Sequence, residues 1–284
     1  NGPGEYKDIG SIDVNPANGE LYLKEMNRQQ IHVYFLDGKF KHSFTFPEGK
    51  RMSRMCLFSP DYLIAEQESK VPDDQDANFY PYLLVSTRDG HLDSLDYVQK
   101  RNILVKLIVN AENHSYAYLL EPSLIRNGSR FYIGNPDSDT LFAMNPDRTL
   151  EPLLVRTPSH SEEGNKYGLF LRGAAGAYFF LTKQPMEVPM NSIESLDLKS
   201  EEWLYDCRTQ EVCRYLLKNK DDASKRVEGI MFFCYPEDCG LAVLKSEDLM
   251  DAYEAGQLSG ELKEIAAGLK ADDNPVLMLI HFKK

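Results

Sequence analysis

Ile31-His-Val-Tyr-Phe-Leu-Asp-Gly-Lys-Phe-Lys-His-Ser-Phe44 is the stretch that decides the fold class of this chain. Apolar and aromatic residues flank the Asp37-Gly38 pair on both sides. Glycine readily adopts the positive φ that a tight turn between antiparallel strands requires. The stretch therefore predicts a β-hairpin, with one strand over residues 31–35 and the next over residues 39–44.

Two more strands precede this hairpin. Apolar residues alternate with a polar one in Ile12-Asp-Val14 and lie together in Glu20-Leu-Tyr-Leu23. Between the two segments, the composition of Asn15-Pro-Ala-Asn-Gly19 is typical of a turn. A second turn at Asn27–Gln30 leads into the hairpin. Residues 8–47 thus predict about four strands in about 40 residues, which is the size of one propeller blade.

Similar units follow with a weaker sequence echo, at residues 51–109, 112–157, 166–217 and 226–282. In the second unit we expect strands that include residues 82–85 and 103–109, and an acid-rich surface loop over residues 66–78. Two helices are predicted in the last unit, at Ser246–Glu254 with Ser246 as N-cap and at Gly260–Leu269.

This pattern predicts an all-β protein, a β-propeller of five to six four-stranded blades with a short helical insertion in the last blade. We expect a single domain over residues 1–284, because no low-complexity linker divides the chain. Two packed β-sandwiches are the alternative, but the repeated four-strand units and the missing Cys…Trp…Cys signature favour the propeller.

Charge and hydropathy exclude several classes of partner. The 284 residues carry a formal net charge of −12, and no basic cluster offsets it, so nucleic-acid binding is not expected. No apolar run approaches the roughly 18 residues that span a membrane. The chain starts without methionine at Asn1. We therefore expect a processed or shortened chain, whose leader would have carried any lipid anchor.

Five cysteines leave two alternatives open. Cys207 and Cys213 flank one predicted turn, and Cys234 and Cys239 flank another, so disulfides across or between these turns would suit an oxidising compartment. Free thiols in the core are the other alternative. The gaps within the two pairs, five and four residues, fit a four-cysteine zinc site poorly.

Motifs of common catalytic and metal sites are missing from the sequence. There is no HExxH, no GxSxG and no phosphate-binding loop, and Gly173–Gly176 has ordinary turn composition. The six histidines have no metal-ligand spacing, and His32 with His42 predicts a surface pair on one hairpin. Ser86–His91 does not fit an Asp box, and the acidic run Asp73–Asp76 does not fit a calcium loop. We predict no catalytic residues, no metal and no cofactor.

Candidate ligand-binding residues follow from the fold instead. In a propeller, the residues just before each inner strand converge on one face, and aromatic and arginine side chains there offer contact area and fixed donors. The candidates of this kind are Tyr6, Arg54, His114, Tyr116, Tyr167 and Arg226.

Three segments carry a resemblance to a known family. They are Gly2-Pro-Gly-Glu-Tyr6, the hairpin Ile31–Phe40, and the tail Asp272-Asp-Asn-Pro-Val-Leu-Met-Leu-Ile-His-Phe-Lys283. All three resemble the six-bladed NHL-like or TolB-like β-propeller proteins of Bacteroides and related gut bacteria. In that family a further blade usually precedes the first of these segments, so the chain is expected to lack an N-terminal blade, to have five blades, or to close the ring differently with its C-terminal strand. The resemblance implies an exported lipoprotein, periplasmic or on the cell surface, and no catalytic residues.

These observations favour a non-enzymatic module that binds a glycan, a peptide or a protein in the cell envelope. The alternative is a polysaccharide hydrolase or lyase with its site at the mouth of the propeller channel. A pair of carboxylates for such an enzyme could not be recognised among the 44 acidic residues. A scaffold that docks another protein is the third hypothesis.

Overall fold

A computed structural model describes the fold of the protein. The described residues are 4–47, 50–67, 80–95, 104–110, 115–120, 124–134, 138–162, 164, 166–189, 200–222, 227, 230–232 and 238–282, with backbone alone at 104–110, 115–120, 189 and 231–232. Contacts divide the chain into two units, each of which is described by itself. Unit 1 comprises Asn1–Val105, Tyr118–Leu124 and Met144–Glu151, and unit 2 comprises Lys106–Ala117, Ile125–Ala143 and Pro152–Lys284.

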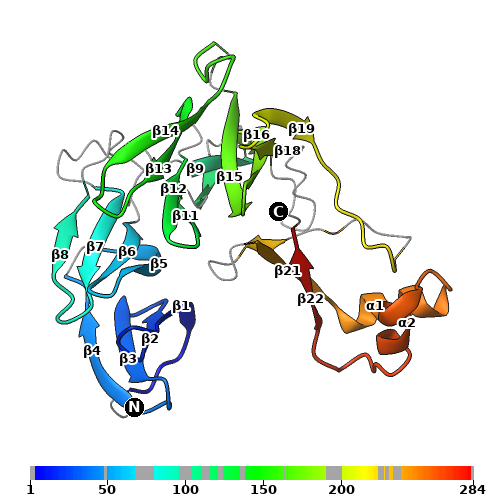
Figure 1. The fold of residues 1–284 in the computed structure, drawn as a ribbon, viewed down its shortest axis with the longest axis horizontal. Helices are drawn as coiled ribbons and strands as arrows, with labels where there is room; N and C mark the ends of the chain where they lie inside the picture. The colour runs from blue at the N-terminus through cyan, green and yellow to red at the C-terminus, as the bar shows by residue number, and fades with distance from the viewer. Residues whose placement is uncertain are drawn as a thin grey trace. The chain divides into compact units, whose positions relative to one another are not determined.

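The first two sheets are antiparallel meanders (dark blue to cyan in Figure 1). Sheet β1-β2-β3-β4 consists of β1 (Ile9–Asn15), β2 (Glu20–Glu25), β3 (Gln30–Phe35) and β4 (Phe40–Thr45). Sheet β5-β6-β7-β8 consists of β5 (Met52–Ser59), β6 (Tyr62–Gln67), β7 (Tyr82–Ser86) and β8 (Leu92–Ser94). Strands adjacent in sequence pair in space, so the local pattern at 8–47 correctly predicted the first meander.

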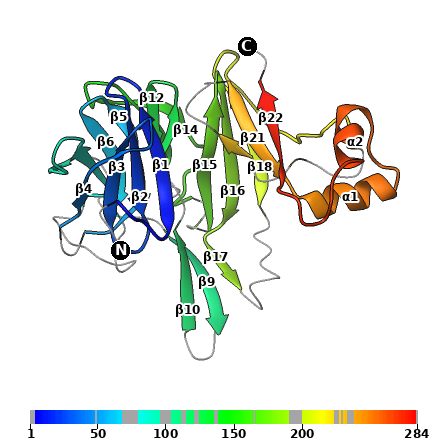
Figure 2. The same cartoon turned by 90° about the horizontal axis from the view of Figure 1, so that it is seen from below.

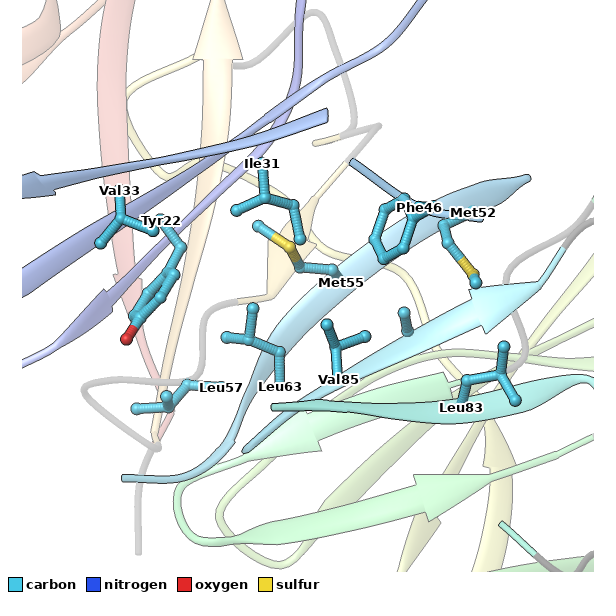
Figure 3. Close-up of a cluster of buried hydrophobic side chains, with 11 residues drawn as sticks. Tyr22, Ile31, Val33, Phe46, Met52, Met55, Leu57, Leu63, Leu83 and Val85 are labelled. Carbon is cyan, nitrogen blue, oxygen red and sulfur yellow. The ribbon is translucent and has the colours of Figure 1, made fainter. Parts of the chain in front are cut away.

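The core of unit 1 lies between these two sheets. Side chains from β2 and β3 meet side chains from β5, β6 and β7, and Figure 3 shows them pointing toward one another. Its buried members are Tyr22, Ile31, Val33, Phe46, Met52, Met55, Leu57, Leu63, Ala65, Leu83 and Val85. Polar contacts add to this packing, because Leu57 N donates to Asp13 Oδ2 at 2.5 Å and Asn15 Nδ2 donates to Pro60 O at 2.9 Å.

Three further sheets repeat the meander. The first has β11 (Leu124–Asn127), β12 (Arg130–Ile133), β13 (Thr140–Met144) and β14 (Leu150–Val155). The next has β15 (Tyr167–Ala175), β16 (Tyr178–Pro185), β18 (Glu201–Asp206) and β19 (Glu211–Arg214). The last has β20 (Met231–Phe232), β21 (Cys239–Leu244) and β22 (Val276–His281). A cluster of apolar side chains of unit 2, including Tyr132, Leu171 and Phe179, packs between the first two of these sheets.

One sheet departs from the prediction. Strand β9 (Leu104–Asn110) was expected to belong to the second blade, but it pairs with β10 (Ser115–Leu120) and, in parallel, with β17 (Glu187–Pro189). The register joins Lys106 to Glu187. This pairing links segments about 80 residues apart in sequence, which no local pattern reports.

The predicted helices are present in the last unit as α1 (Ser246–Glu254) and α2 (Gly260–Ala266), between β21 and β22. Figures 1 and 2 show them at the end of the strands where β21 ends and β22 begins. Ser246 is not the N-cap as predicted, because it lies inside the first turn after Lys245. Its buried hydroxyl instead donates to the carbonyls of Asp273 and Asn274, at 3.0 and 2.8 Å.

The fold is the predicted all-β propeller, and among the described residues five sheets are meanders, four with four strands and one with three. In the part of the chain that the structure describes, neither helix is long and apolar enough to cross a membrane. Most of the predicted loop at 66–78 lies outside the described residues.

Candidate functional site

The predicted site residues fall in three groups. Tyr6 precedes β1 and Tyr167 begins β15, and both side chains are exposed, by 46% and 40%. Arg54 is exposed within β5, at the irregular pairing step between Met52 and Met55. For Tyr116 only the backbone of β10 is described, and the remaining two candidates, His114 and Arg226, lie outside the described residues.

Tyr167 lies at a cationic corner of unit 2, formed with Arg156, His160 and Lys183. The Tyr167 carbonyl accepts hydrogen bonds from Arg156 Nη1 at 3.3 Å and from His160 Nδ1 at 3.0 Å. The ammonium of Lys183, on the neighbouring strand β16, lies 5.0 Å from the centre of the Tyr167 ring. Lys183 is therefore the cation at the exposed ring, whereas Arg156 and His160 hold the Tyr167 backbone, and Arg156 also pairs with Asp139 at 3.9 Å.

The loop before β15 is held by its own polar contacts. Asp139 accepts a hydrogen bond from the backbone N–H of His160 at 2.6 Å, and the backbone N–H of Arg156 donates to the Asp139 carbonyl at 2.8 Å. A cavity lined by Asp139, Arg156, Leu169 and other residues has a volume of about 20 Å³, which is room for about one water molecule. This corner is therefore a surface platform and not a deep pocket.

Tyr6 belongs to an aromatic cluster of unit 1. Its ring meets Tyr34 edge to face, with centroids 6.5 Å apart, and Tyr34 meets Phe40 in the same way at 5.7 Å. The Tyr34 hydroxyl donates to the Gly4 carbonyl. Burial, followed by the nearby Tyr6, raises the pKa of Tyr34. Residues 4–7 line an open hollow of about 360 Å³ beside these rings.

A buried polar pair lies in the same sheet. His32 Nε2 is 3.3 Å from Glu25 Oε2, and both side chains are buried. The prediction of a surface pair of His32 and His42 is wrong. The register sets His32 opposite Ser43 and His42 opposite Val33, so the two rings project from opposite faces of the sheet.

Four hairpin turns each contain an aspartate whose pKa is lowered, first by a hydrogen bond from a neighbouring side chain and then by a backbone N–H of the turn. Asp37, Asp89, Asp147 and Asp206 each accept the backbone N–H two residues further on, at 2.9–3.1 Å. A neighbouring side chain adds the larger effect, and beside Arg208 it lowers the pKa of Asp206 to about 2. These carboxylates stabilise turns, so their pKa shifts do not indicate acid–base chemistry.

Of the four cysteines in the predicted disulfides, Cys207, Cys213 and Cys239 are free thiols in the structure, and which cysteines pair stays a prediction. Cys207 and Cys213 are exposed, and Cys234 lies outside the described residues. Cys239 is buried; burial and then Asp238 raise the pKa of its thiol. Together with Asp238 and His281 it forms the one group, among the described residues, that could hold a metal ion.

Comparison with known families identifies the chain. Residues 1–281 match the family model described as a domain of unknown function, DUF4934. The chain belongs to the DUF4934 family. No curated protein matches this DUF4934 domain in sequence at a significant level.

Solved structures resemble the DUF4934 domain at low sequence identity. A Bacteroides fragilis protein whose name designates it as exported is 14% identical over 100% of this chain and 80% of its own, with a TM-score of 0.63. A DUF4221 family member from Bacteroides vulgatus is 8% identical over 99% of this chain and 81% of its own, with a TM-score of 0.49. A Bacteroides caccae protein of unknown function is 9% identical over 96% of this chain and 77% of its own, with a TM-score of 0.41. The first likeness shows that the fold is shared.

Sequence reasoning missed the partners of Tyr167. Arg156 and His160 lie in the loop before β15, and Lys183 lies on β16, where the register pairs it with Leu169. The alternation of β15 and β16 could have shown that Lys183 shares a sheet face with Tyr167. The loop residues carry no comparable sequence signal.

Proposed function

We propose that this DUF4934 domain is an extracytoplasmic binding module, periplasmic or on the cell surface, that recognises a glycan, a peptide or a protein without transforming it. The cationic corner around Tyr167 carries the proposal. An exposed aromatic ring at the start of β15, with the Lys183 ammonium 5.0 Å from its centre, supplies a flat contact surface beside a cation.

The corner favours a ligand with a carboxylate beside a flat apolar face. A tyrosine ring packs on such a face, whether of a sugar or of an aromatic peptide side chain, and the lysine at the ring attracts the carboxylate. Acidic oligosaccharides and peptides with a free C-terminal carboxylate combine both features. The shallow form of the corner also fits a larger partner that presents such a group on its surface.

The pKa shifts support binding over glycoside hydrolysis. A glycosidase acid keeps its proton near neutral pH, which requires a raised pKa in one carboxyl of a close pair. Among the residues that the structure describes, the carboxyl groups with clear shifts have lowered pKa values, and four of them are turn aspartates. Hydrolase or lyase activity remains the rival function and is tested directly below.

The assignment of the chain to a particular group of propellers is part of the same proposal. We place the chain among six-bladed NHL-like or TolB-like propellers, as one domain over residues 1–284 with a lipid-anchored leader. The meandering sheets and the fold shared with a Bacteroides protein named as exported support export and a propeller of this general kind. Blade number and lipid anchor stay predictions.

A thermal-shift screen tests the binding function. Ligands that bind the folded state raise the melting temperature with concentration, since binding is linked to folding by mass action. The panel contains acidic and neutral oligosaccharides, and peptides with free or amidated C-termini. We expect a shift with a carboxylate-bearing ligand, and loss of that shift in Tyr167→Ala. Tyr253→Ala is the matched control, because Tyr253 is a similarly exposed tyrosine on α1.

Three outcomes would overturn the proposal or its choice of site. If Tyr167→Ala retains the full shift while Tyr6→Ala abolishes it, the aromatic cluster of unit 1 is the site. If the shifting oligosaccharide is cleaved in overnight product analysis, the domain is an enzyme. A panel without any shift favours the third hypothesis, a scaffold that docks another protein.

A further inference from the structure

Three side chains with metal-ligating atoms converge at the end of the last sheet: Asp238, Cys239 and His281. The register of β21 and β22 sets Cys239 directly opposite His281. The backbone N–H of Phe282 donates to the Asp238 carbonyl at 2.8 Å and extends this pairing by one step. The cluster is therefore built on paired strands and not on a free loop.

The ligand atoms are close enough to share one ion. The Cys239 sulfur lies 3.1 Å from His281 Nδ1 and 3.7 Å from Asp238 Oδ1, and all three ligand atoms lie within 4.8 Å of one another. With Zn–S near 2.3 Å and Zn–N or Zn–O near 2.1 Å, a tetrahedral ion sets sulfur about 3.6 Å from each of the other two atoms. The observed distances fall on both sides of this value, so small side-chain movements suffice.

The types of ligand select the metal. Thiolate, imidazole and carboxylate together are the ligands of zinc, whereas calcium and magnesium require oxygen ligands. Three protein ligands with a fourth position open to water form a familiar arrangement for this ion. We propose that Asp238, Cys239 and His281 bind one Zn²⁺ ion.

The three ligands differ in burial, so the cluster is accessible to an ion from the side of the exposed ligand. Cys239 is buried with no exposed surface, Asp238 is half-buried, and His281 is exposed. An ion can enter past the histidine, whereas a larger substrate cannot reach the buried sulfur. This geometry argues against Cys239 acting as a nucleophile toward a macromolecule.

A bound ion would clamp the two strands at this end. Cys239 begins β21 and His281 ends β22, while α1 and α2 lie at the opposite end of the same strands (Figures 1 and 2). The two ligands are 42 residues apart in sequence, so zinc would also close the loop that contains both helices.

Cobalt substitution tests the proposal. The full 284-residue chain is stripped with chelator under reducing conditions, and Co²⁺ is then titrated in. We expect one equivalent to give a thiolate-to-cobalt charge-transfer band and the visible bands of tetrahedral cobalt, both displaced by one equivalent of Zn²⁺. Cys239→Ser should abolish the charge-transfer band. His281→Gln should weaken Zn²⁺ binding at least about 100-fold, more than loss of an outer partner costs.

Controls separate this cluster from the other thiols. Cys207→Ser with Cys213→Ser removes two exposed thiols of the same unit and should leave the spectrum unchanged. His281 is exposed, so His281→Gln should fold normally, and circular dichroism checks this. The proposal is overturned if the charge-transfer band is missing in the unmodified chain, survives Cys239→Ser, or disappears in the Cys207 and Cys213 double variant.

Discussion

Tyr22 should make the protein sensitive to alkali, because its phenol is buried beside a carboxylate. The side chain lies on β2 with 0% of its surface exposed, and its hydroxyl donates to Glu20, which also binds the ammonium of Lys41. Burial, and then the proximity of Glu20, raises the pKa of Tyr22 to about 12 from an ordinary value of 10.0. The folded state therefore keeps the phenol proton up to a higher pH than the unfolded state does.

The size and sign of the effect follow from these two pKa values. Between pH 10 and 12 the unfolded chain binds fewer protons at this site, so the free energy of unfolding falls as pH rises. One pKa unit corresponds to about 1.4 kcal/mol, so the loss reaches about 1.4 kcal/mol at pH 11 and levels off near 2.7 kcal/mol above pH 12. Below pH 10 the stabilisation from this site is fully present.

Tyr22→Phe keeps the ring and removes the titrating group. At pH 8 the variant should be less stable by roughly 1.5–3 kcal/mol, because it lacks the hydrogen bond to a charged partner. Between pH 8 and pH 11 it should lose about 1.4 kcal/mol less than the unmodified protein. Urea unfolding followed by circular dichroism at pH 8, 10 and 11 measures both differences.

Tyr253→Phe is the control, because Tyr253 is exposed on α1. This variant should leave the fall in the free energy of unfolding at alkaline pH unchanged. Parallel stability curves for Tyr22→Phe and the unmodified protein would refute the reasoning. They would mean that burial and the Glu20 carboxylate do not hold this phenol neutral.

Two further predictions concern unit 1. Leu63→Ala should lower the free energy of unfolding by about 3 kcal/mol, because the side chain is fully buried in the core of Figure 3, whereas exposed Leu36→Ala should change it by less than about 0.5 kcal/mol. Equal effects in urea unfolding would contradict the core assignment. Gly38 and Gly90 both have positive φ. A Cβ added at Gly90 would lie 2.5 Å from the Phe44 ring, whereas a Cβ added at Gly38 would have no atom within 4 Å. Gly38→Ala should therefore cost about 1–2 kcal/mol and Gly90→Ala at least about 1 kcal/mol more, and the reverse order of melting temperatures would argue against this packing.

The sequence predicted the sheets well where pairing is local. In the first sheet, the predicted strands at 31–35 and 39–44 correspond to β3 and β4, because a tight turn with Asp37 and Gly38 fixes which residues face each other. The second blade was predicted less well. Strand β9 leaves it to pair with β17, and nothing near residue 106 indicates a partner near residue 187.

Sites were harder to predict than sheets because their residues come from separate segments. Tyr167 was predicted as a ligand-binding residue, and this role stays a prediction; its cationic neighbours come from a loop and from β16. Cys239 was considered for disulfides with cysteines near it in sequence. Its partner in space is His281, and the two helices that separate them in sequence conceal the pairing.

The turn aspartates explain why acidic composition says little about function here. Asp37, Asp89, Asp147 and Asp206 occur at the hairpins β3–β4, β7–β8, β13–β14 and β18–β19, each bonded to the backbone two residues on. The same local contact therefore recurs in four sheets, where it stabilises the hairpin turns. It also explains these negative charges without any ligand. Groups with a different purpose stand out against this background. They are the Lys183 ammonium over the exposed Tyr167 ring and the mixed sulfur, nitrogen and oxygen ligands at Cys239.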